Sequence, residues 1–436
     1  MRSIVIPVAL LVCAAWGSAC SVILPLGGPA GAADSASPDL LADGPGSLDN
    51  ASDGACACPL GCDDAGACKT FVPSNLPAFP APTCAGISFS ADGTIDTGTC
   101  LVLFCKGTLV PQSNGPQICR FAVGQFVITQ EATVTVSGPN ALLVAASAVV
   151  KISGTLDASA TGRIAGPGGW DGGDIVNDGF GGTGTGGAGP GGGKHCGCRA
   201  VVDGEGDDCG GGGAGFATAG GTGGSELTTP VCSLVGAGGP TYGNDGVIPL
   251  QGGSGGASGH NDSMPSSSPP GVGGGGGGAL QIVALTTISL EGKIRAAGGG
   301  GGGDYGSGGG GGSGGAVLLE APLVSGTGKV TVAGGGGGGA GTGTNSAGTL
   351  QAKGNPGQDG PDTGQAWGGI GATAADGGGG MGGGGGTKGP TSGLPGDRGG
   401  GGGGASGRIR VNNLDGKLPP GMSLNGDATS GALQPH

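Results

Sequence analysis

Long runs of glycine limit how this chain can fold more than any other feature of its sequence. Ordering a glycine costs roughly 0.5–1 kcal/mol more backbone entropy than ordering an alanine, and glycine brings no side chain to a core. We therefore expect either mobile loops or polyglycine II helices, which pack side by side because backbones without side chains approach closely. The runs abut strand-like segments at similar places, which favours packing. They include Gly273–Gly278, Gly298–Gly303, Gly308–Gly312, Gly334–Gly339 and Gly399–Gly404.

An internal repeat of short apolar segments separates these runs. A unit that offers strands and a turn buries its apolar face only against a neighbouring copy, so the repeat predicts an all-β fold of β-solenoid or β-helix-like repeats with long glycine-rich loops. We expect Ile282, Ile288 and Ile294 to be buried. The copies are Ala141–Ala146 followed by Gly154, Ala279–Ala284 followed by Gly292, Ala316–Ala321 followed by Gly328, and a poorer one, Gly407–Val411 followed by Gly416.

The charge of the chain restricts its partners. Its formal net charge is −13 and only 11 % of its residues are charged. Nucleic acid is excluded as a partner because its phosphates would be repelled. Neutral glycans of the cell envelope or matrix and cations are compatible with this charge.

The N-terminus has the pattern of an export signal. Arg2 precedes an apolar stretch, Ile4–Val12, that is too short to cross a bilayer as a helix. Gly17, Ser18 and Ala19 are small residues directly before Cys20, and this arrangement resembles the lipobox of bacterial lipoproteins. The resemblance implies cleavage after Ala19, a lipid on Cys20 and attachment to the outer membrane or cell surface. Ordinary secretion with the same cleavage site is the alternative.

The cysteines support export into an oxidising compartment. Removing Cys13 with the signal and Cys20 with its lipid leaves an even number, which is typical of disulfide pairing. A zinc site beside His195 is the weaker alternative, because the C-x-C spacing does not suit zinc. The disulfide candidates form three groups: Cys56, Cys58, Cys62 and Cys68; Cys84, Cys100, Cys105 and Cys119; Cys196, Cys198, Cys209 and Cys232.

Composition divides the chain into seven regions. The second is rich in Gly, Ala, Ser, Pro and Asp and is expected to be a flexible tether, and the third is a small disulfide-rich segment. The regions are a signal peptide (1–19), the tether (20–55), the Cys-rich segment (56–119), a first β-repeat region (120–165), a Gly/Asp/Cys-rich loop region (166–278), β and glycine repeats (279–418) and a C-terminal tail (419–436).

Acidic residues gather in the loop region. Carboxylates on glycine-rich turns suit calcium, so a calcium-binding wall protein is one alternative function, although solvated loop positions are the simpler interpretation. No other cofactor is expected. The acidic residues are Asp171, Asp174, Asp178, Asp203, Glu205, Asp207 and Asp208.

A second alternative is a carbohydrate-active enzyme. Four short motifs occur in the order found in the polygalacturonase family: Asn177-Asp178, Asp207-Asp208, Gly259-His260 and Arg408-Ile409-Arg410. The partial resemblance implies a β-helix in which Asp207, Asp208 and His260 are catalytic, because paired carboxylates supply the acid and base for glycoside hydrolysis. Glycan subsites also use aromatic platforms, for which the candidates are Trp170, Trp367, Tyr242 and Tyr305.

Taken together, the lipobox-like start, the Cys-rich segment and the glycine repeats ending in Gly407-Arg408-Ile409-Arg410 resemble the glycine-rich surface lipoproteins of myxobacteria. The glycine runs also resemble mycobacterial PE-PGRS proteins in composition. The resemblance implies a non-catalytic surface protein with a structural, adhesive or cell-envelope role, held on the membrane by its N-terminal lipid.

Overall fold

The computed structural model describes residues 58–176, 183–196, 208–225, 235–261, 269–342, 352–384 and 389–435. Every regular element in these residues is a β-strand, which confirms the all-β class. Within the same residues, no helical segment has the length and hydropathy that a membrane crossing requires. The signal peptide, Cys20 and the whole tether lie outside the described residues.

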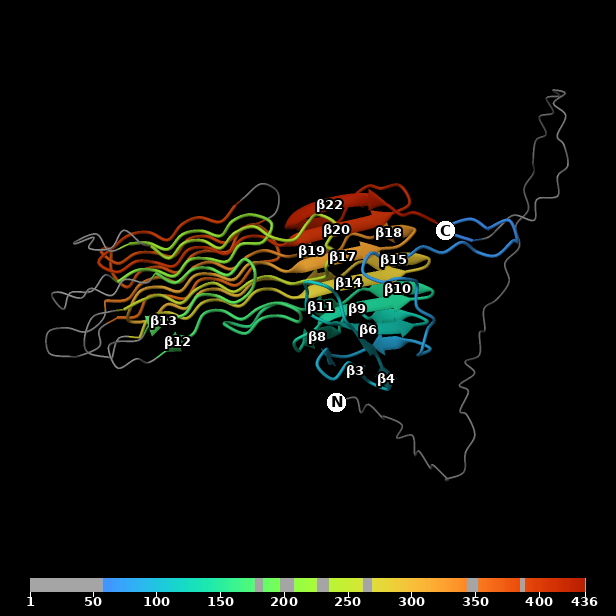
Figure 1. Cartoon of the computed structure of the whole chain (residues 1–436), viewed down its shortest axis with the longest axis horizontal. Helices are drawn as coiled ribbons and strands as arrows, with labels where there is room; N and C mark the ends of the chain where they lie inside the picture. The colour runs from blue at the N-terminus through green and yellow to red at the C-terminus, as the bar shows by residue number, and fades with distance from the viewer. Residues whose placement is uncertain are drawn as a thin grey trace, which may run out of the picture. The chain divides into compact units, whose positions relative to one another are not determined.

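Most strands belong to three large sheets (Figure 1), and residues of all three contribute to one apolar core. Their neighbouring strands are parallel, except at the N-terminal edge, where β2–β3, β3–β4 and β5–β6 are antiparallel. The seven-stranded sheet has the order β22 (Asp427–Ala432), β20 (Arg408–Asn413), β17 (Ala316–Glu320), β14 (Ala279–Ala284), β9 (Ala141–Ala146), β6 (Ile118–Val123) and β5 (Thr108–Val110).

The other two large sheets contain the strands that precede β5 and most of those that lie between the strands of the seven-stranded sheet in sequence. The five-stranded sheet has the order β1 (Ile87–Phe89), β7 (Phe126–Ile128), β10 (Val149–Ile152), β15 (Thr287–Leu290) and β18 (Leu323–Ser325). The eight-stranded sheet has the order β21 (Ser423–Asn425), β19 (Lys329–Thr331), β16 (Lys293–Arg295), β11 (Thr155–Asp157), β8 (Thr133–Ser137), β2 (Gly93–Asp96), β3 (Leu101–Val102) and β4 (Cys105–Lys106). A separate pair joins β12 (Ile175–Val176) and β13 (Thr183–Gly184).

The strand pairing follows the sequence repeat. Three successive strands of one copy, such as β9, β10 and β11, enter three different sheets, and each pairs in parallel with the equivalent strand of the next copy. Leu142 lies opposite Leu280, and Leu156 lies opposite Ile294. Lys293 lies opposite Lys329 of the following copy. The interval from Ala316 to Lys329 is one residue shorter than the interval from Ala279 to Lys293, as the sequence repeat predicts.

Side-chain burial explains this arrangement. Strands β10 and β15 alternate between exposed or half-buried and buried residues, so one face of the five-stranded sheet packs on the core. Ile282, Ile288 and Ile294 all belong to this core and are fully buried, as expected. Strands β9 and β14 are buried on both faces, because residues from 60–76 and 216–250 form a second apolar cluster on the other face.

Beyond the sheets, the glycine-rich segments run alongside one another (Figure 1) and form backbone hydrogen bonds. The central segment, 308–315, donates with a period of three residues: Gly308, Gly311 and Gly314 donate to 399–405, whereas Gly309, Gly312 and Gly315 donate to 296–302. Gly310 and Ser313 donate to 254–257. Carbonyl oxygens of the same segment accept bonds from 211–214, 274–277 and 335–338, so six other segments surround it.

We call these hydrogen-bonded segments the glycine bundle. Many of its glycines leave no room for a side chain: a Cβ built on Gly308, Gly310 or Gly311 would lie within 3.0 Å of backbone atoms of a neighbouring segment. The bundle includes described residues of 166–196, 208–224, 236–240, 252–260, 271–278, 298–303, 308–315, 334–341, 354–360, 366–383 and 391–407.

Two expected regions, and the last copy of the repeat, are arranged differently from the prediction. The Cys-rich segment 56–119 contributes β1 to β5 and the start of β6 to the large sheets, so it is not a separate module. The expected tail, 419–436, contains β21 and β22, which pair with β19 and β20. Ser423 lies opposite Lys329, so Met422, rather than Gly416, takes the place that Gly328 has in the preceding copy.

Candidate functional site

Disulfides link cysteines within each of the predicted groups. The pairs are Cys58–Cys68, Cys84–Cys105, Cys100–Cys119 and Cys196–Cys209, with Cα–Cα distances of 5.3, 5.8, 5.4 and 6.4 Å. Cys62 is also disulfide-bonded. Cys56, Cys198 and Cys232 lie outside the described residues.

Two of these disulfides hold a short hairpin at the N-terminal edge of the eight-stranded sheet. The hairpin joins β3 to β4, and we call residues 101–106 the apolar hairpin. Cys100, which precedes it, is bonded to Cys119 of β6, and Cys105 on β4 is bonded to Cys84. Both cysteines at the hairpin are buried, with 2 % and 4 % of their surface exposed.

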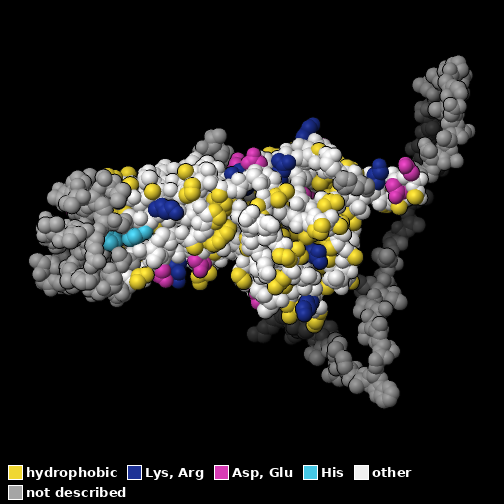
Figure 2. Space-filling view, viewed as in Figure 1, with side chains coloured by type: hydrophobic (Ala, Val, Ile, Leu, Met, Phe, Trp, Pro, Cys, Tyr) yellow, Lys and Arg dark blue, Asp and Glu magenta, His cyan; other side chains and the backbone are white. Residues whose placement is uncertain are grey.

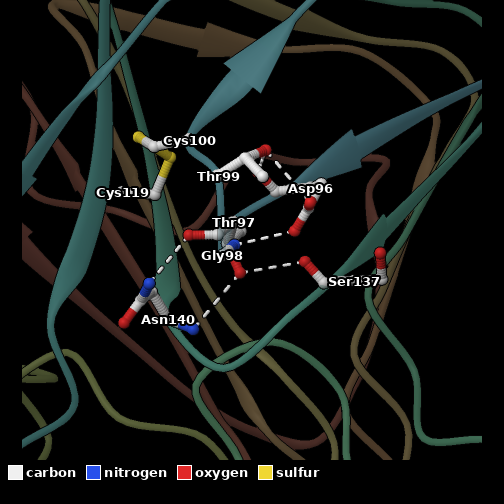
Figure 3. Close-up of a disulfide and its surroundings, with 8 residues drawn as sticks. All are labelled: Asp96, Thr97, Gly98, Thr99, Cys100, Cys119, Ser137 and Asn140. Atoms are coloured by element: carbon white, nitrogen blue, oxygen red, sulfur yellow. Dashed lines mark hydrogen bonds between the residues drawn. A yellow bond between two sulfur atoms is a disulfide. The ribbon is translucent and has the colours of Figure 1, made fainter.

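Hydrogen bonds fix the turn that leads into this hairpin (Figure 3). The Asp96 carboxylate accepts bonds from the Gly98 N–H at 2.8 Å and the Thr99 hydroxyl at 3.0 Å. These bonds lower the pKa of Asp96 below its ordinary value. On the other side of the turn, the Asn140 side-chain amide donates to the Thr97 carbonyl at 2.7 Å, and the Thr97 N–H donates to the Ser137 carbonyl at 2.8 Å.

The apolar side chains at the hairpin tip are exposed. Phe104 is fully exposed, with a relative accessibility of 104 %, and Leu101 and Leu103 are 50 % and 57 % exposed. Leu103 and Cys100 have positive φ angles of 49° and 52°, a region that costs non-glycine residues free energy. The fold therefore holds three large apolar side chains in water instead of burying them.

Two of the three proposed catalytic residues, Asp208 and His260, lie in the glycine bundle. Asp208 is buried and pairs with Arg398, with 2.6 Å between carboxylate oxygen and Nε. The backbone N–H of His260 donates to the Cys209 carbonyl, so the structure brings His260 close to the neighbour of Asp208. Asp207 lies outside the described residues. Both Asp208 and His260 were expected in solvated loops, but both are buried. Glycine segments that are distant in sequence pack around them and are joined to their segments by backbone hydrogen bonds.

His260 packs against a second histidine. The rings of His195 and His260 are edge to face, with centroids 5.2 Å apart, and His195 precedes the buried Cys196–Cys209 disulfide. Burial, together with the neighbouring His260, lowers the pKa of His195, so its neutral form is favoured. Figure 2 shows histidine atoms at the end of the bundle away from the sheets.

Of the two remaining polygalacturonase-like motifs, the structure describes only the one that begins at Arg408, and it lies on a strand rather than in the bundle. Arg408 is on β20, where it pairs with Asp245 at 2.6 Å and lies over the ring of Phe216. Asn177 and Asp178 are outside the described residues.

The aromatic residues proposed as glycan platforms lie in different surroundings, and most are not widely exposed. Tyr242 stacks on Phe216 with ring centroids 4.4 Å apart, and its hydroxyl donates to the Gly252 carbonyl at 2.6 Å. Burial raises the pKa of Tyr242, and the half-buried Trp170 packs on its edge. Tyr305 lies under the Lys353 ammonium group, and only Trp367 is widely exposed. These rings do not form one platform.

Those acidic residues proposed for calcium that the structure describes have protein partners. Asp171 accepts from the Ala165 N–H, and Asp174 pairs with Arg163 at 3.3 Å. Among the residues that the structure describes, no group of three or more His, Cys, Asp or Glu side chains is arranged to hold a metal ion. Asp178, Asp203 and Glu205 lie outside them.

A polar network that the sequence analysis missed joins the Cys-rich segment to the seven-stranded sheet. The buried Glu320 carboxylate accepts from the Ser74 hydroxyl at 2.6 Å, from Gln281 and from Asn412. Glu320, Gln281 and Asn412 are on adjacent strands, so the repeat register brings them together. The sequence feature that could have indicated this network is a single acidic residue, Glu320, in an otherwise apolar strand, Ala316–Glu320.

Comparison with family models, curated proteins and solved structures found no match to this chain.

Proposed function

We propose that this chain is an exported surface lipoprotein, attached through Cys20, with a structural or adhesive role rather than a catalytic one. In this proposal the strand repeats form a β-solenoid, and the glycine bundle consists of polyglycine II helices that extend it. The described chain is then a stiff, charge-poor body displayed from the membrane.

The hydrogen bonding of segment 308–315 carries the proposal. A period of three residues is that of a polyproline II-type helix, which has no internal hydrogen bonds and therefore bonds to its neighbours. Six neighbours around one segment are what side-by-side packing of such helices requires. A body of this kind uses its backbone for cohesion, which leaves few side chains for chemistry.

The sheets and disulfides support the same function. Parallel pairing of equivalent strands from successive copies is the arrangement of stacked repeats. The disulfides suit an oxidising compartment outside the cytoplasm. The carboxylate of Asp208, which the enzyme alternative needs, is engaged by Arg398. On the face that Figure 2 shows, the described part of the glycine bundle has few charged side chains, which favours a structural or neutral-glycan-binding surface.

The attachment is tested at Cys20. Mass spectrometry of the natural protein should give Cys20 as the first mature residue, with more than one acyl chain, because a single chain binds membranes only marginally. Cys20→Ser should move the protein from the membrane fraction to the soluble fraction. An unmodified Cys20, or a mature chain that begins at another residue, would exclude the lipid anchor.

A further inference from the structure

We propose that a polar pocket on the outer face of the eight-stranded sheet binds one ring of a neutral saccharide. The proposal names the ligand class for the adhesive role proposed above and rests on that role. The pocket has a volume of about 290 Å³, close to the lower limit of roughly 300 Å³ for small-molecule sites, so it suits a single sugar ring. Its polar lining residues are Thr135, Asp157, Ser159, Thr161, Arg295 and Asp359.

The pocket forms where a row of side chains on the sheet is no longer covered. Thr135 of β8, Asp157 of β11 and Arg295 of β16 lie next to one another in register. The row continues with Thr331 of β19, which is only 1 % exposed because its hydroxyl donates to the Asp362 carbonyl and the chain around Asp362 packs over it. At the other end of the row Thr135 is exposed. The step from the covered to the open part of the row creates the pocket.

Hydrogen bonds hold the other walls of the pocket in place. In the segment that follows β11, the Ala160 N–H donates to the Ala297 carbonyl at 2.9 Å, and the Ser159 hydroxyl accepts from the Ala297 N–H at 3.1 Å. Asp359 comes from the glycine bundle, and its carboxylate accepts from the Gly300 N–H at 2.8 Å. The pocket is therefore formed before a ligand arrives, and binding does not require the ordering of a loop.

The charges of the pocket disfavour an ionic ligand. The Arg295 guanidinium lies 3.2 Å from the Asp157 carboxylate and 2.9 Å from the Asp362 carboxylate, so its charge is already paired and does not attract an anion. The other Asp157 oxygen accepts from the Ser159 N–H at 2.9 Å. A calcium ion needs about six to eight oxygen ligands, whereas the described residues contain no group of three or more His, Cys, Asp or Glu side chains arranged for a metal. A neutral ligand fits these charges best.

The polar groups that remain match the hydroxyl groups of a sugar. The hydroxyls of Thr135 and Thr161 and one carboxylate oxygen of Asp359 form no hydrogen bond with the described protein. A sugar hydroxyl both donates and accepts, so it pairs with a side-chain hydroxyl as well as with a carboxylate, and the bond to the charged acceptor is the stronger one. The buried methyl groups of Ala160 and Ala297, which also line the pocket, offer apolar contact to the C–H groups of the ring.

The test uses the mature chain with Cys20→Ser, so that binding is measured without the anchor. The probes are the methyl glycosides of glucose, galactose, mannose and N-acetylglucosamine, measured by saturation-transfer-difference NMR and isothermal titration calorimetry. At least one should bind with a Kd on the order of millimolar, because a single ring buries little surface. Thr135→Val should weaken its binding about 5- to 10-fold, and Asp359→Asn about 10-fold, through the loss of one hydrogen bond each.

Thr133→Val is the matched control, because Thr133 is an exposed threonine on the same face of β8 but lies outside the pocket. It should bind the glycoside as tightly as the parent does, and thermal unfolding confirms that the variants are folded. The proposal is overturned if no glycoside binds the parent, or if Thr135→Val binds as tightly as Thr133→Val. Binding of calcium chloride or sodium acetate without binding of any glycoside would also overturn it, in favour of an ionic site.

The outcome is independent of the membrane attachment. Because Cys20 is absent from all these proteins, a failure to bind glycosides would leave the lipid anchor and the structural role of the glycine bundle untouched. An unmodified natural Cys20 would in turn leave the glycoside result untouched.

Discussion

The sheets and the glycine bundle reach the same degree of burial by opposite means. In the sheets, apolar side chains such as Leu156 and Ile294 fill the core, and backbone hydrogen bonds join neighbouring strands. In the bundle, Gly310 is equally buried, but its neighbours are backbone atoms on every side. The sheets are therefore held by apolar side-chain burial, and the bundle by hydrogen bonds that the absence of side chains permits.

This difference predicts opposite responses to mutation. A sheet core tolerates a change of shape better than a loss of volume. The bundle has little side-chain volume to lose. Whether it tolerates an added methyl group depends on the space around the particular glycine that is replaced. Ser313 is a position where the bundle holds a small side chain, and its hydroxyl forms hydrogen bonds with the backbone of Ser254 in the neighbouring segment.

The largest effect is expected for one added methyl group in the bundle. Gly310→Ala places a Cβ within 3.0 Å of the backbone of Gly212 and Gly213, where no side chain can move aside. We expect a loss of about 3–5 kcal/mol in the free energy of unfolding, at or above the usual range for overpacking. Denaturant unfolding measures the loss, and hydrogen exchange should place it first in the bundle.

Gly378→Ala is the matched control, because the nearest atoms to its added Cβ are 3.6 Å away. It should change stability by less than about 1 kcal/mol, in the stabilising direction, since alanine loses less entropy on folding. Equal losses for the two variants would mean that close backbone packing does not hold the bundle together.

The next largest effect is expected in the sheet core. Leu156→Ala removes a fully buried side chain of β11 and should cost about 2–4 kcal/mol through lost burial and the cavity left behind. Hydrogen exchange should increase first in the strands rather than in the bundle. Leu323→Ala, at a 54 % exposed position on β18, is the control and should cost less than about 0.5 kcal/mol. Matching exchange patterns for Leu156→Ala and Gly310→Ala would show that the two regions unfold as one.

The same contrast explains how far the sequence predicted the structure. Strand copies could be aligned because each residue type marks a register, so that Leu142 opposite Leu280 follows from the repeat alone. Glycine runs have no such marks, because every residue in them is the same, and the neighbours of segment 308–315 could not be predicted. The sequence is therefore compatible with both ordered and mobile glycine runs.

The candidate site was predicted less well for a related reason. Asp208 and His260 lie in glycine-rich sequence of a composition typical of solvent-exposed loops. Their burial depends on segments that are far away in sequence. Strand β22 was missed because its residues, Asp427–Ala432, are small and polar, and it pairs only because β20 offers a free edge. Phe104 stood between cysteines in the printed sequence, but its exposure depends on two disulfides whose pairing the sequence left open.

The smallest effect expected is a pH response confined to the bundle. The pKa of His195 is lowered, first by burial and then by His260, whereas in the unfolded chain it returns to about 6.5. As the pH falls below that value, the unfolded chain takes up a proton at His195 that the folded chain resists, so the free energy of unfolding decreases. The stability is fully present above the unfolded pKa and is lost progressively as the pH falls towards the folded pKa. His195→Gln should remove part of the difference between melting temperatures at neutral and mildly acidic pH, and hydrogen exchange should show the acid response of the parent in the bundle rather than in the sheets. A parent and variant with the same pH dependence would mean that His195 is as free to take up a proton in the folded protein as in the unfolded chain.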